Sequence, residues 1–358
     1  MYNDIWLEIL SRLDIESLLK IRELNCYFNN YVCNNKLNSN NAIKTNDYNK
    51  LLTFLNLNDG NGIINLYYDL DITERHLGSS KLIFYKVTST IMTNLLNIIA
   101  LDLSYNDRVH SNWICHLTNV TMLNLSYNHF ITNEGIENMY KLKILKLSSN
   151  KTISKLKHLI NLKELWLDWN EIITNNDLSY LTNLETINLD SNVLITDDGL
   201  RRLTNLKNLN LYRNNVITDY GIKTLKYLEA LNIYNNNTIT DIGINNLINL
   251  KTFHPGQLNG ITSECFKSLT NLTELNLEYN KDPKYNEINE LNNLKKLHLS
   301  SVMTDHCLNN FPNLTDLGLY DNELITINGI KKLKYLDLRS NKNITPESLS
   351  DLLYLNIR

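Results

Sequence analysis

The sequence contains no apolar run that approaches eighteen residues, so no membrane-spanning helix is expected. Its first fifteen residues include Asp4, Glu8, Arg12 and Asp14, and these charges leave no room for the apolar centre of a secretory signal. We therefore expect no membrane partner and a cytoplasmic location, with the nucleus as a second compartment open to the protein.

Cysteine pairs and basic clusters are also lacking. No Cys-x-x-Cys pair occurs, so the sequence predicts reduced thiols at its five cysteines, Cys26, Cys33, Cys115, Cys265 and Cys307. Lys and Arg (35) nearly balance Asp and Glu (38), for a net charge of -3 without any basic block. Because binding to nucleic acid requires clustered Lys and Arg, no nucleic-acid partner is expected.

The common catalytic motifs are missing. The chain has no GxxxxGKS/T phosphate loop, no HExxH zinc motif, no GxSxG esterase motif and no GxGxxG dinucleotide motif. We therefore expect a protein that is not an enzyme, with no cofactor and no metal.

What the sequence does contain is an internal repeat. Leu206-Lys-Asn-Leu209-Asn-Leu211-Tyr-Arg-Asn214 reads L-x-x-L-x-L-x-x-N, and the same pattern starts at Leu184, Leu228 and Leu272. A tail of the form Ile-Thr-Asp-x-Gly-Ile/Leu follows at Ile195, Ile217 and Ile239. A single repeat cannot bury its own apolar face, so such units must stack to make a core.

This pattern resembles the leucine-rich repeat. The resemblance implies an α/β solenoid, in which a curved parallel sheet carries short helices or turns on its convex side. Each L-x-L places two side chains inside, while the residue between them points outward. The Asn amide is expected to satisfy buried backbone groups. A Thr in the tail is expected to be the N-cap of the convex helix, at positions 132, 174, 196, 218, 240, 262 and 345.

The repeats extend over most of the chain with a dominant spacing of 22 residues. The pattern Asn falls at 106, 128, 150, 170, 192, 214, 236, 280, 322 and 341, with Leu258 and Val302 at the equivalent places. Two imperfect repeats precede these, one around Ile64 and one around Tyr85 and Val87. Leu355-Asn-Ile357 starts a last strand. The prediction is a solenoid of about fourteen repeats over residues 61–358, preceded by a linker and solenoid cap at 37–60.

The first 36 residues form a separate segment. Apolar residues at helical spacing predict three short helices, which are too small to make a stable core alone. Ile9-Leu-Ser-Arg-Leu-Asp14, then Ser17-Leu-Leu-Lys-Ile-Arg22, then Leu24 and Phe28 resemble the F-box. The segment departs from the family at Met1-Tyr2, where a Leu-Pro is usual, at Ser17, and at Leu24-Asn25.

The F-box resemblance implies that residues 1–36 bind a Skp1-like adaptor and through it a cullin. The adaptor-binding face that it implies comprises Ile5, Ile9, Leu10, Leu18, Leu19, Leu24 and Phe28. The alternative from pattern alone is a helical cap on the open end of the solenoid, since terminal repeats need one.

Outward positions on most strands carry Asn, Ser or Asp, but one group of repeats differs. There the sequence places an aromatic and charged cluster, the predicted substrate-binding site: Trp166, Asp168, Trp169, Asp190, Tyr212, Arg213 and Tyr234. Trp, Tyr and Arg dominate the energetics of interfaces, which favours a binding role. Tyr320 and Arg339 are the second location considered.

Two pairs of residues invite a chemical reading. Asp168 and Asp190 occupy equivalent positions on adjacent strands, yet an open sheet offers no pocket to separate their pKa values, so an acidic face for a basic ligand is favoured over catalysis. His254 and His298 lie two repeats apart, roughly 10 Å, which is too far to share one zinc ion.

The sequence therefore predicts the substrate-recognition subunit of a Skp1-cullin-F-box ubiquitin ligase, which holds an unidentified target protein on its concave sheet. Two binding alternatives remain: an intracellular repeat scaffold with a helical cap and no ubiquitin-ligase link, and a surface adhesion protein, which the acidic N-terminus disfavours.

Overall fold

The computed structural model describes residues 99–106, 109–256, 260–279, 288, 290–299, 301–320, 322–330, 333–339, 341, 344 and 349, with the backbone of 43–44, 63–65 and 356–357. The chain divides into two compact units, Met1–Leu165 and Trp166–Arg358. The predicted adaptor-binding residues, Ile5 to Phe28, lie outside the described residues, so the boundaries of the F-box and linker stay predictions.

The described residues of the first unit form a parallel sheet and two short helices. Its strands pair in the order of the sequence: β1 (Ile43–Lys44), β2 (Ile63–Asn65), β3 (Ala100–Asp102), β4 (Met122–Asn124) and β5 (Ile144–Lys146). Its helices are α7 (Ser111–Ile114) and α8 (Asn133–Ile136). β6 (Glu164–Trp166) contains the boundary between the units. β1 lies within residues 37–60, where the sequence predicts linker and cap.

One predicted strand is wrong in its placement. The sequence predicts one repeat around Ile64. It predicts a second repeat around Tyr85 and Val87, between Ile64 and Leu101. Instead, Ile64 pairs directly with Leu101, so β2 and β3 are neighbours and no strand lies between them. The segment between them has no L-x-L pair flanked by the pattern Asn, which is the signal that marks the regular repeats.

The second unit continues the same architecture. Its strands after β6 are β7 (Thr186–Asn188), β8 (Asn208–Asn210), β9 (Ala230–Asn232), β10 (Thr252–His254), β11 (Glu274–Asn276), β12 (Lys296–His298), β13 (Asp316–Gly318), β14 (Tyr335–Asp337) and β15 (Asn356–Ile357). Its helices are α9 (Asn175–Leu178), α10 (Asp197–Leu200), α11 (Asp219–Ile222), α12 (Asp241–Ile244), η3 (Ser263–Lys267), α13 (Asp305–Leu308) and α14 (Ile327–Ile330).

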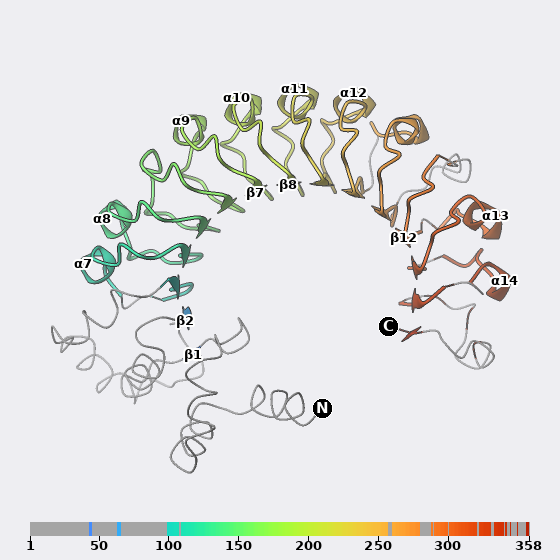
Figure 1. The fold of residues 1–358 in the computed structure, drawn as a ribbon, viewed down its shortest axis with the longest axis horizontal. Helices are drawn as coiled ribbons and strands as arrows, with labels where there is room; N and C mark the ends of the chain where they lie inside the picture. The colour runs from blue at the N-terminus through green and yellow to red at the C-terminus, as the bar shows by residue number, and fades with distance from the viewer. Residues whose placement is uncertain are drawn as a thin grey trace, which may run out of the picture. The chain divides into compact units, whose positions relative to one another are not determined.

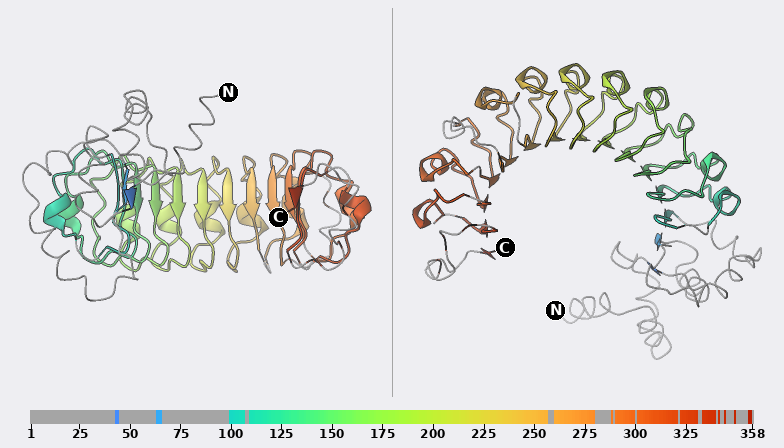
Figure 2. Two further views of the ribbon diagram at one scale, coloured as in Figure 1. Left: turned by 90° about the horizontal axis from the view of Figure 1, so that it is seen from below. Right: turned by 180° about the vertical axis from the view of Figure 1, so that it is seen from behind.

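Within this second unit, the strands line the inner side of a curve and the helices its outer side (Figures 1 and 2). We call the inner side the concave face. Leu209 pairs with Leu231, as the 22-residue spacing predicts. The repeat with Leu258 at the place of the pattern Asn keeps the register, because its Phe253 takes the leucine position between Leu231 and Leu275. The predicted last strand at the chain end is confirmed as β15.

The pattern Asn stabilises each turn, as expected. Asn214 is 1% exposed, and its Nδ2 donates to the backbone oxygens of Leu189 (3.2 Å) and Asn192 (2.8 Å) in the preceding repeat. Its Oδ1 accepts from the backbone N–H groups of Val216 (3.1 Å) and Ile217 (3.0 Å). One side chain thus satisfies four backbone groups, and the three that are buried would otherwise cost about 1–3 kcal/mol each.

The Ile-Thr-Asp tail forms a second ladder on the convex side. Thr218 is the N-cap of α11, as predicted, and its oxygen accepts from the N–H of Tyr220. In addition, its hydroxyl and its N–H donate to Asp197 of the preceding repeat at 2.7 and 2.8 Å. Thr240 with Asp219 and Thr262 with Asp241 repeat these bonds. The Asp of each tail therefore holds the next repeat in place.

Cys115, Cys265 and Cys307 are free thiols, and burial raises the pKa of Cys307 to about 12. Among the residues described, no helix has the length and apolar character needed to cross a bilayer.

Candidate functional site

The concave face of the second unit is built on residues that stand between the two strand leucines. At Asn188, Asn210 and Asn232 the side-chain Oδ1 accepts from the backbone N–H two residues on, at 3.0, 3.1 and 3.0 Å. These N–H groups belong to Asp190, Tyr212 and Tyr234, which are members of the predicted site. The asparagines are thus structural, and they fix where the site residues leave the strands.

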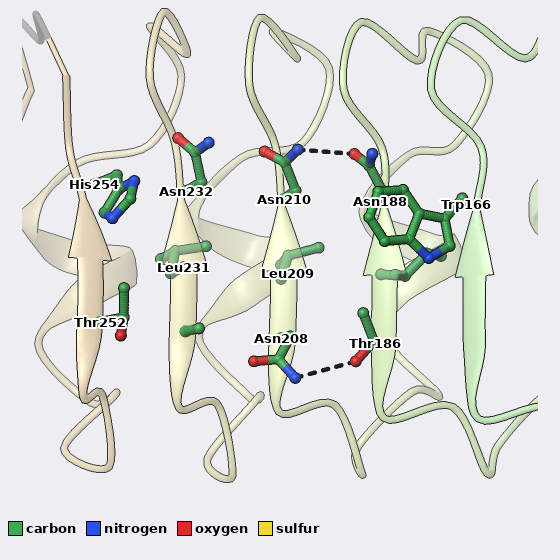
Figure 3. Close-up of a pocket in the computed structure, with 12 residues that line it drawn as sticks. Trp166, Thr186, Asn188, Asn208, Leu209, Asn210, Leu231, Asn232, Thr252 and His254 are labelled. Atoms are coloured by element: carbon green, nitrogen blue, oxygen red, sulfur yellow. Dashed lines mark hydrogen bonds between the residues drawn. The ribbon is translucent and has the colours of Figure 1, made fainter. Parts of the chain in front are cut away.

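The same asparagines also bond to one another across the strands (Figure 3). Asn210 Nδ2 donates to Asn188 Oδ1 at 2.9 Å, and Asn188 Nδ2 donates to Asp168 Oδ1 at 3.1 Å. The chain of amides therefore points its donors toward the Asp168 carboxylate. Asn232 lies outside this chain: among the bonds of the described residues, its Nδ2 donates none.

A shallow hollow lies over these strands, with Trp166 at one end and His254 at the other (Figure 3). Its volume is about 270 Å³, below the roughly 300–1,000 Å³ of small-molecule pockets. Polar groups and short apolar side chains line it: Thr186, Ile187, Asn188, Asn208, Leu209, Asn210, Ala230, Leu231, Asn232 and Thr252. The hollow is large enough for side chains of a partner, and too small for a bulky cofactor.

The structure brings several members of the predicted site together. Tyr212 and Tyr234 stack, with ring centroids 5.2 Å apart and planes 10° from parallel. The Arg213 guanidinium carbon lies 4.9 Å from the centre of the Tyr212 ring. Trp166 lines the hollow, whereas Trp169 is 54% exposed and makes no ring contact among the described residues. The binding role of these residues stays a prediction.

Trp169 and Arg213 occupy unusual backbone positions. Their φ angles are +54° and +53°, in the left-handed region that side chains with a Cβ rarely adopt. Ser149, Ser191 and Asn235 take the same conformation one residue before the pattern Asn, so the turn is a property of the repeat. Gly or Asn would adopt this left-handed conformation more easily than Trp. The turn therefore gives no structural reason for an exposed Trp at position 169.

The negative charge of Asp168 acts on the Asp190 carboxyl. Burial raises the pKa of Asp190, the negative charge of Asp168 raises it further, and the Ser191 hydroxyl and Arg213 lower it. Asp190 accepts a hydrogen bond from Ser191 at 2.8 Å, but within the described part of the chain it has no ion-pair partner.

Sequence reasoning missed part of the aromatic surface. Tyr279 contacts Tyr234 edge-on at 5.7 Å and Tyr320 at 5.4 Å, which extends the Tyr212–Tyr234 pair into a row of four rings. Gly256 makes this possible, because a Cβ there would lie 2.7 Å from the Tyr234 Cα. A glycine between two tyrosine-bearing repeats is the signal that could have pointed to the contact.

His254 and His298 lie on strands that are two repeats apart, as their spacing in the sequence predicts. His298 Nδ1 is 3.0 Å from Glu278 Oε1, and Gly318 leaves room for its ring. His254 Nε2 is 3.9 Å from Glu274 Oε1, and burial lowers the pKa of His254. No group of three or more His, Cys, Asp or Glu suited to a metal occurs among the described residues.

Comparison with known proteins agrees with this architecture. The family model described as "Leucine Rich repeat" matches residues 116–139, 180–203 and 329–353. The matched segments are leucine-rich repeats. No curated protein matches the chain.

Solved structures show the same fold. An internalin from Listeria monocytogenes is 25% identical with a TM-score of 0.54, over 75% of this chain and 81% of the internalin. A leucine-rich-repeat protein from Leptospira interrogans is 22% identical with a TM-score of 0.56, over 88% of this chain and 99% of its own. Toll in the Toll–Spatzle complex of Drosophila is 20% identical with a TM-score of 0.53, over 76% of this chain and 40% of the other.

Proposed function

We propose that this chain is a protein-recognition subunit that binds its target on the concave face of the second unit. The leucine-rich-repeat scaffold supports a role in protein interaction. The observation that carries the proposal is the exposed Trp169, three residues along the chain from the Trp166 that lines the hollow, because large aromatic side chains on a surface are typical anchors of protein interfaces.

The arrangement supports binding more than chemistry. The face is open, and the Oδ1 atoms of Asn188, Asn210 and Asn232 at its centre accept backbone hydrogen bonds. The subunit would act by raising the local concentration of one protein beside another.

A capture experiment tests this proposal. Full-length chain and a Trp166→Ala/Trp169→Ala variant are used to retain proteins from lysate of the native host. The variant should fold but lose the retained protein, while Tyr220→Ala should keep it, because Tyr220 is 72% exposed on the convex helix α11. Retention of the same protein by the double variant would place the site elsewhere, with Tyr320 and Arg339 as the next candidates.

We further propose that the target is a ubiquitination substrate and that residues 1–36 bind a Skp1-like adaptor. The support is the F-box resemblance, which provides more apolar residues than three short helices can bury among themselves. Ile5, Ile9, Leu10 and Leu18 would be covered when the adaptor binds. The chain would then work in the cytoplasm or nucleus as the interchangeable receptor of a cullin-based ligase.

The adaptor proposal has its own test. Leu10→Asp with Leu18→Asp should lower adaptor binding at least about a hundredfold, because each buried unpaired charge costs several kcal/mol. The repeats should melt as in the parent, since a solenoid couples mainly between neighbours. If the parent retains no Skp1 or cullin, the helices are a cap and the chain is a scaffold without a ubiquitin-ligase link.

A further inference from the structure

We propose that the turns after strands β6, β7 and β8, at residues 169–172, 191–194 and 213–216, bind an apolar segment of the target that carries one acidic residue. This inference rests on the proposed function and specifies the chemistry of the partner. It commits to a segment of a protein chain, with its apolar side chains on the first two turns and its carboxylate on Arg213 of the third.

The three turns lie side by side in the second unit. Asn192 Nδ2 donates to the backbone oxygen of Asn170 at 3.0 Å, which joins the first turn to the second. Asn214 Nδ2 donates to the backbone oxygen of Asn192 at 2.8 Å, which joins the second turn to the third. Side chains that leave the three turns therefore come from neighbouring repeats, about 4.8 Å apart at the strands.

These turns expose a group of apolar side chains, which we call the turn patch. On the first turn Trp169 is 54% exposed, and on the second turn Val193 is 63% and Leu194 is 37% exposed. Ile172 and Val216 are half-buried and complete the patch. Apolar side chains that gather on one exposed surface usually mark an interaction site.

The turns themselves do not require an apolar residue at position 193. Val193 follows the pattern Asn of its repeat, and the residues at the same place in the next two repeats are Asn215 and Asn237. Both asparagines are exposed. The position therefore accepts a polar side chain, and Val193 adds apolar surface that the fold does not need.

Arg213 supplies a positive charge next to the turn patch. Its guanidinium carbon lies 4.9 Å from the centre of the Tyr212 ring, and this stacking restrains the planar group. Arg213 is exposed, and within the described part of the chain it belongs to no ion pair. A guanidinium that stacks on a ring keeps the N–H groups along its edge, which match the two oxygens of a carboxylate.

The Asp190 carboxylate of the preceding repeat does not take up this charge. Burial, which raises the pKa of Asp190, is the strongest influence on that carboxyl, and the attraction of Arg213 is the weakest of those that act on it. Asp190 accepts its side-chain hydrogen bond from the Ser191 hydroxyl, at 2.8 Å. Arg213 is therefore open to a carboxylate of the partner.

The spacing of the turns sets the pattern of the segment. Arg213 is the only Lys or Arg in the three turns, so the acidic residue is expected at the third turn. Two strand spacings of about 4.8 Å separate the first turn from the third, roughly 10 Å. An extended chain covers about 3.3 Å per residue, so about three residues separate the acidic residue from the apolar residue that contacts Trp169.

The test is selection of phage-displayed random twelve-residue peptides on the full-length chain, followed by affinity measurements with the enriched peptides. The parent is compared with Arg213→Gln and with Val193→Asn, which introduces the residue found in the next two repeats. Arg201→Gln is the control for charge, because Arg201 is exposed at the end of α10 in an ion pair with Asp198. Ile242→Asn is the control for apolar surface, because Ile242 is 72% exposed on α12. Melting curves verify that each protein is folded.

The parent and both controls should enrich peptides in which an Asp or Glu lies about three residues from a large apolar residue. Arg213→Gln should bind these peptides at least about tenfold more weakly, and Val193→Asn about fivefold more weakly. Added salt should weaken binding to the parent more than to Arg213→Gln, because the charge pair is exposed.

Enriched peptides without an acidic residue, equal binding by either variant, or no enrichment would overturn the inference. The proposed function is tested separately, since it fails only if Trp166→Ala/Trp169→Ala still captures the target. If that double variant loses the target while Arg213→Gln binds the peptides as the parent does, the proposed function stands and the acidic segment is wrong.

Discussion

Gly221 of α11 lies directly against Asp197 of the preceding repeat, because a Cβ at position 221 would be 2.5 Å from the Asp197 Oδ1. The same carboxylate accepts two bonds from Thr218. The Ile-Thr-Asp-x-Gly tail is thus one device: Asp binds the next Thr, and the next Gly leaves the space for it.

The close contact between Gly221 and Asp197 predicts that Gly221→Ala lowers the stability of the fold, which is the reverse of the usual effect of this change in a helix. In an ordinary helix Gly→Ala stabilises by about 1 kcal/mol, but Gly221→Ala should destabilise by about 1–3 kcal/mol through overpacking. In an Asp197→Ala background the same change should cost at least about 1 kcal/mol less. Denaturant unfolding of the four proteins measures this, and an equal cost in both backgrounds would refute the contact.

The asparagine ladder predicts a large loss from a single amide. Asn214→Ala should lower the midpoint of thermal unfolding clearly, since four backbone groups, three of them buried, lose their partner. Asn205→Ala is the matched control, because that exposed side chain makes one bond, to Thr182 O at 3.0 Å. Calorimetry that finds the two variants equally stable would show that the ladder is not what holds the turns.

His254 predicts a loss of stability in mild acid. Burial lowers the pKa of His254 in the folded state below the usual 6.5. Below pH 6.5 the unfolded chain therefore binds more protons than the folded chain, and the stability of the fold decreases as the pH is lowered. Below the lowered pKa both states are protonated and the effect levels off. Thermal melts between pH 7.5 and 5.5 should therefore shift less in His254→Asn than in the parent.

The control for that series is His116→Asn, since His116 is exposed. Its pH dependence should match that of the parent. If His254→Asn also matches the parent, the imidazole is not held neutral by burial and the His254 end of the hollow is charged in acid.

The repeat and its register could be predicted from the sequence because they depend on side-chain periodicity. Leu209, Leu231 and Asn214 repeat at a fixed spacing, and the core admits only one register for them. The adjacency of Tyr212 and Tyr234 follows from the same spacing. The binding role of these residues and of the F-box segment remains a prediction.

The contacts that the sequence did not reveal run between side chains of different repeats. The Asp197–Thr218 bonds depend on where a helix starts, and the Tyr234–Tyr279 contact skips a strand because Gly256 has no side chain. Periodicity places backbones, whereas such contacts depend on rotamers and on left-handed turns such as the one at Trp169.

Recognition by the concave face is tested most directly by photo-cross-linking. A photoreactive amino acid replaces either the exposed Trp169 or Tyr220, which is exposed on the convex helix α11, and each protein is irradiated with the target that the parent captures. The account predicts a cross-link to the target from position 169 and none from position 220. A cross-link from position 220 alone, or equal yields from both, would contradict it.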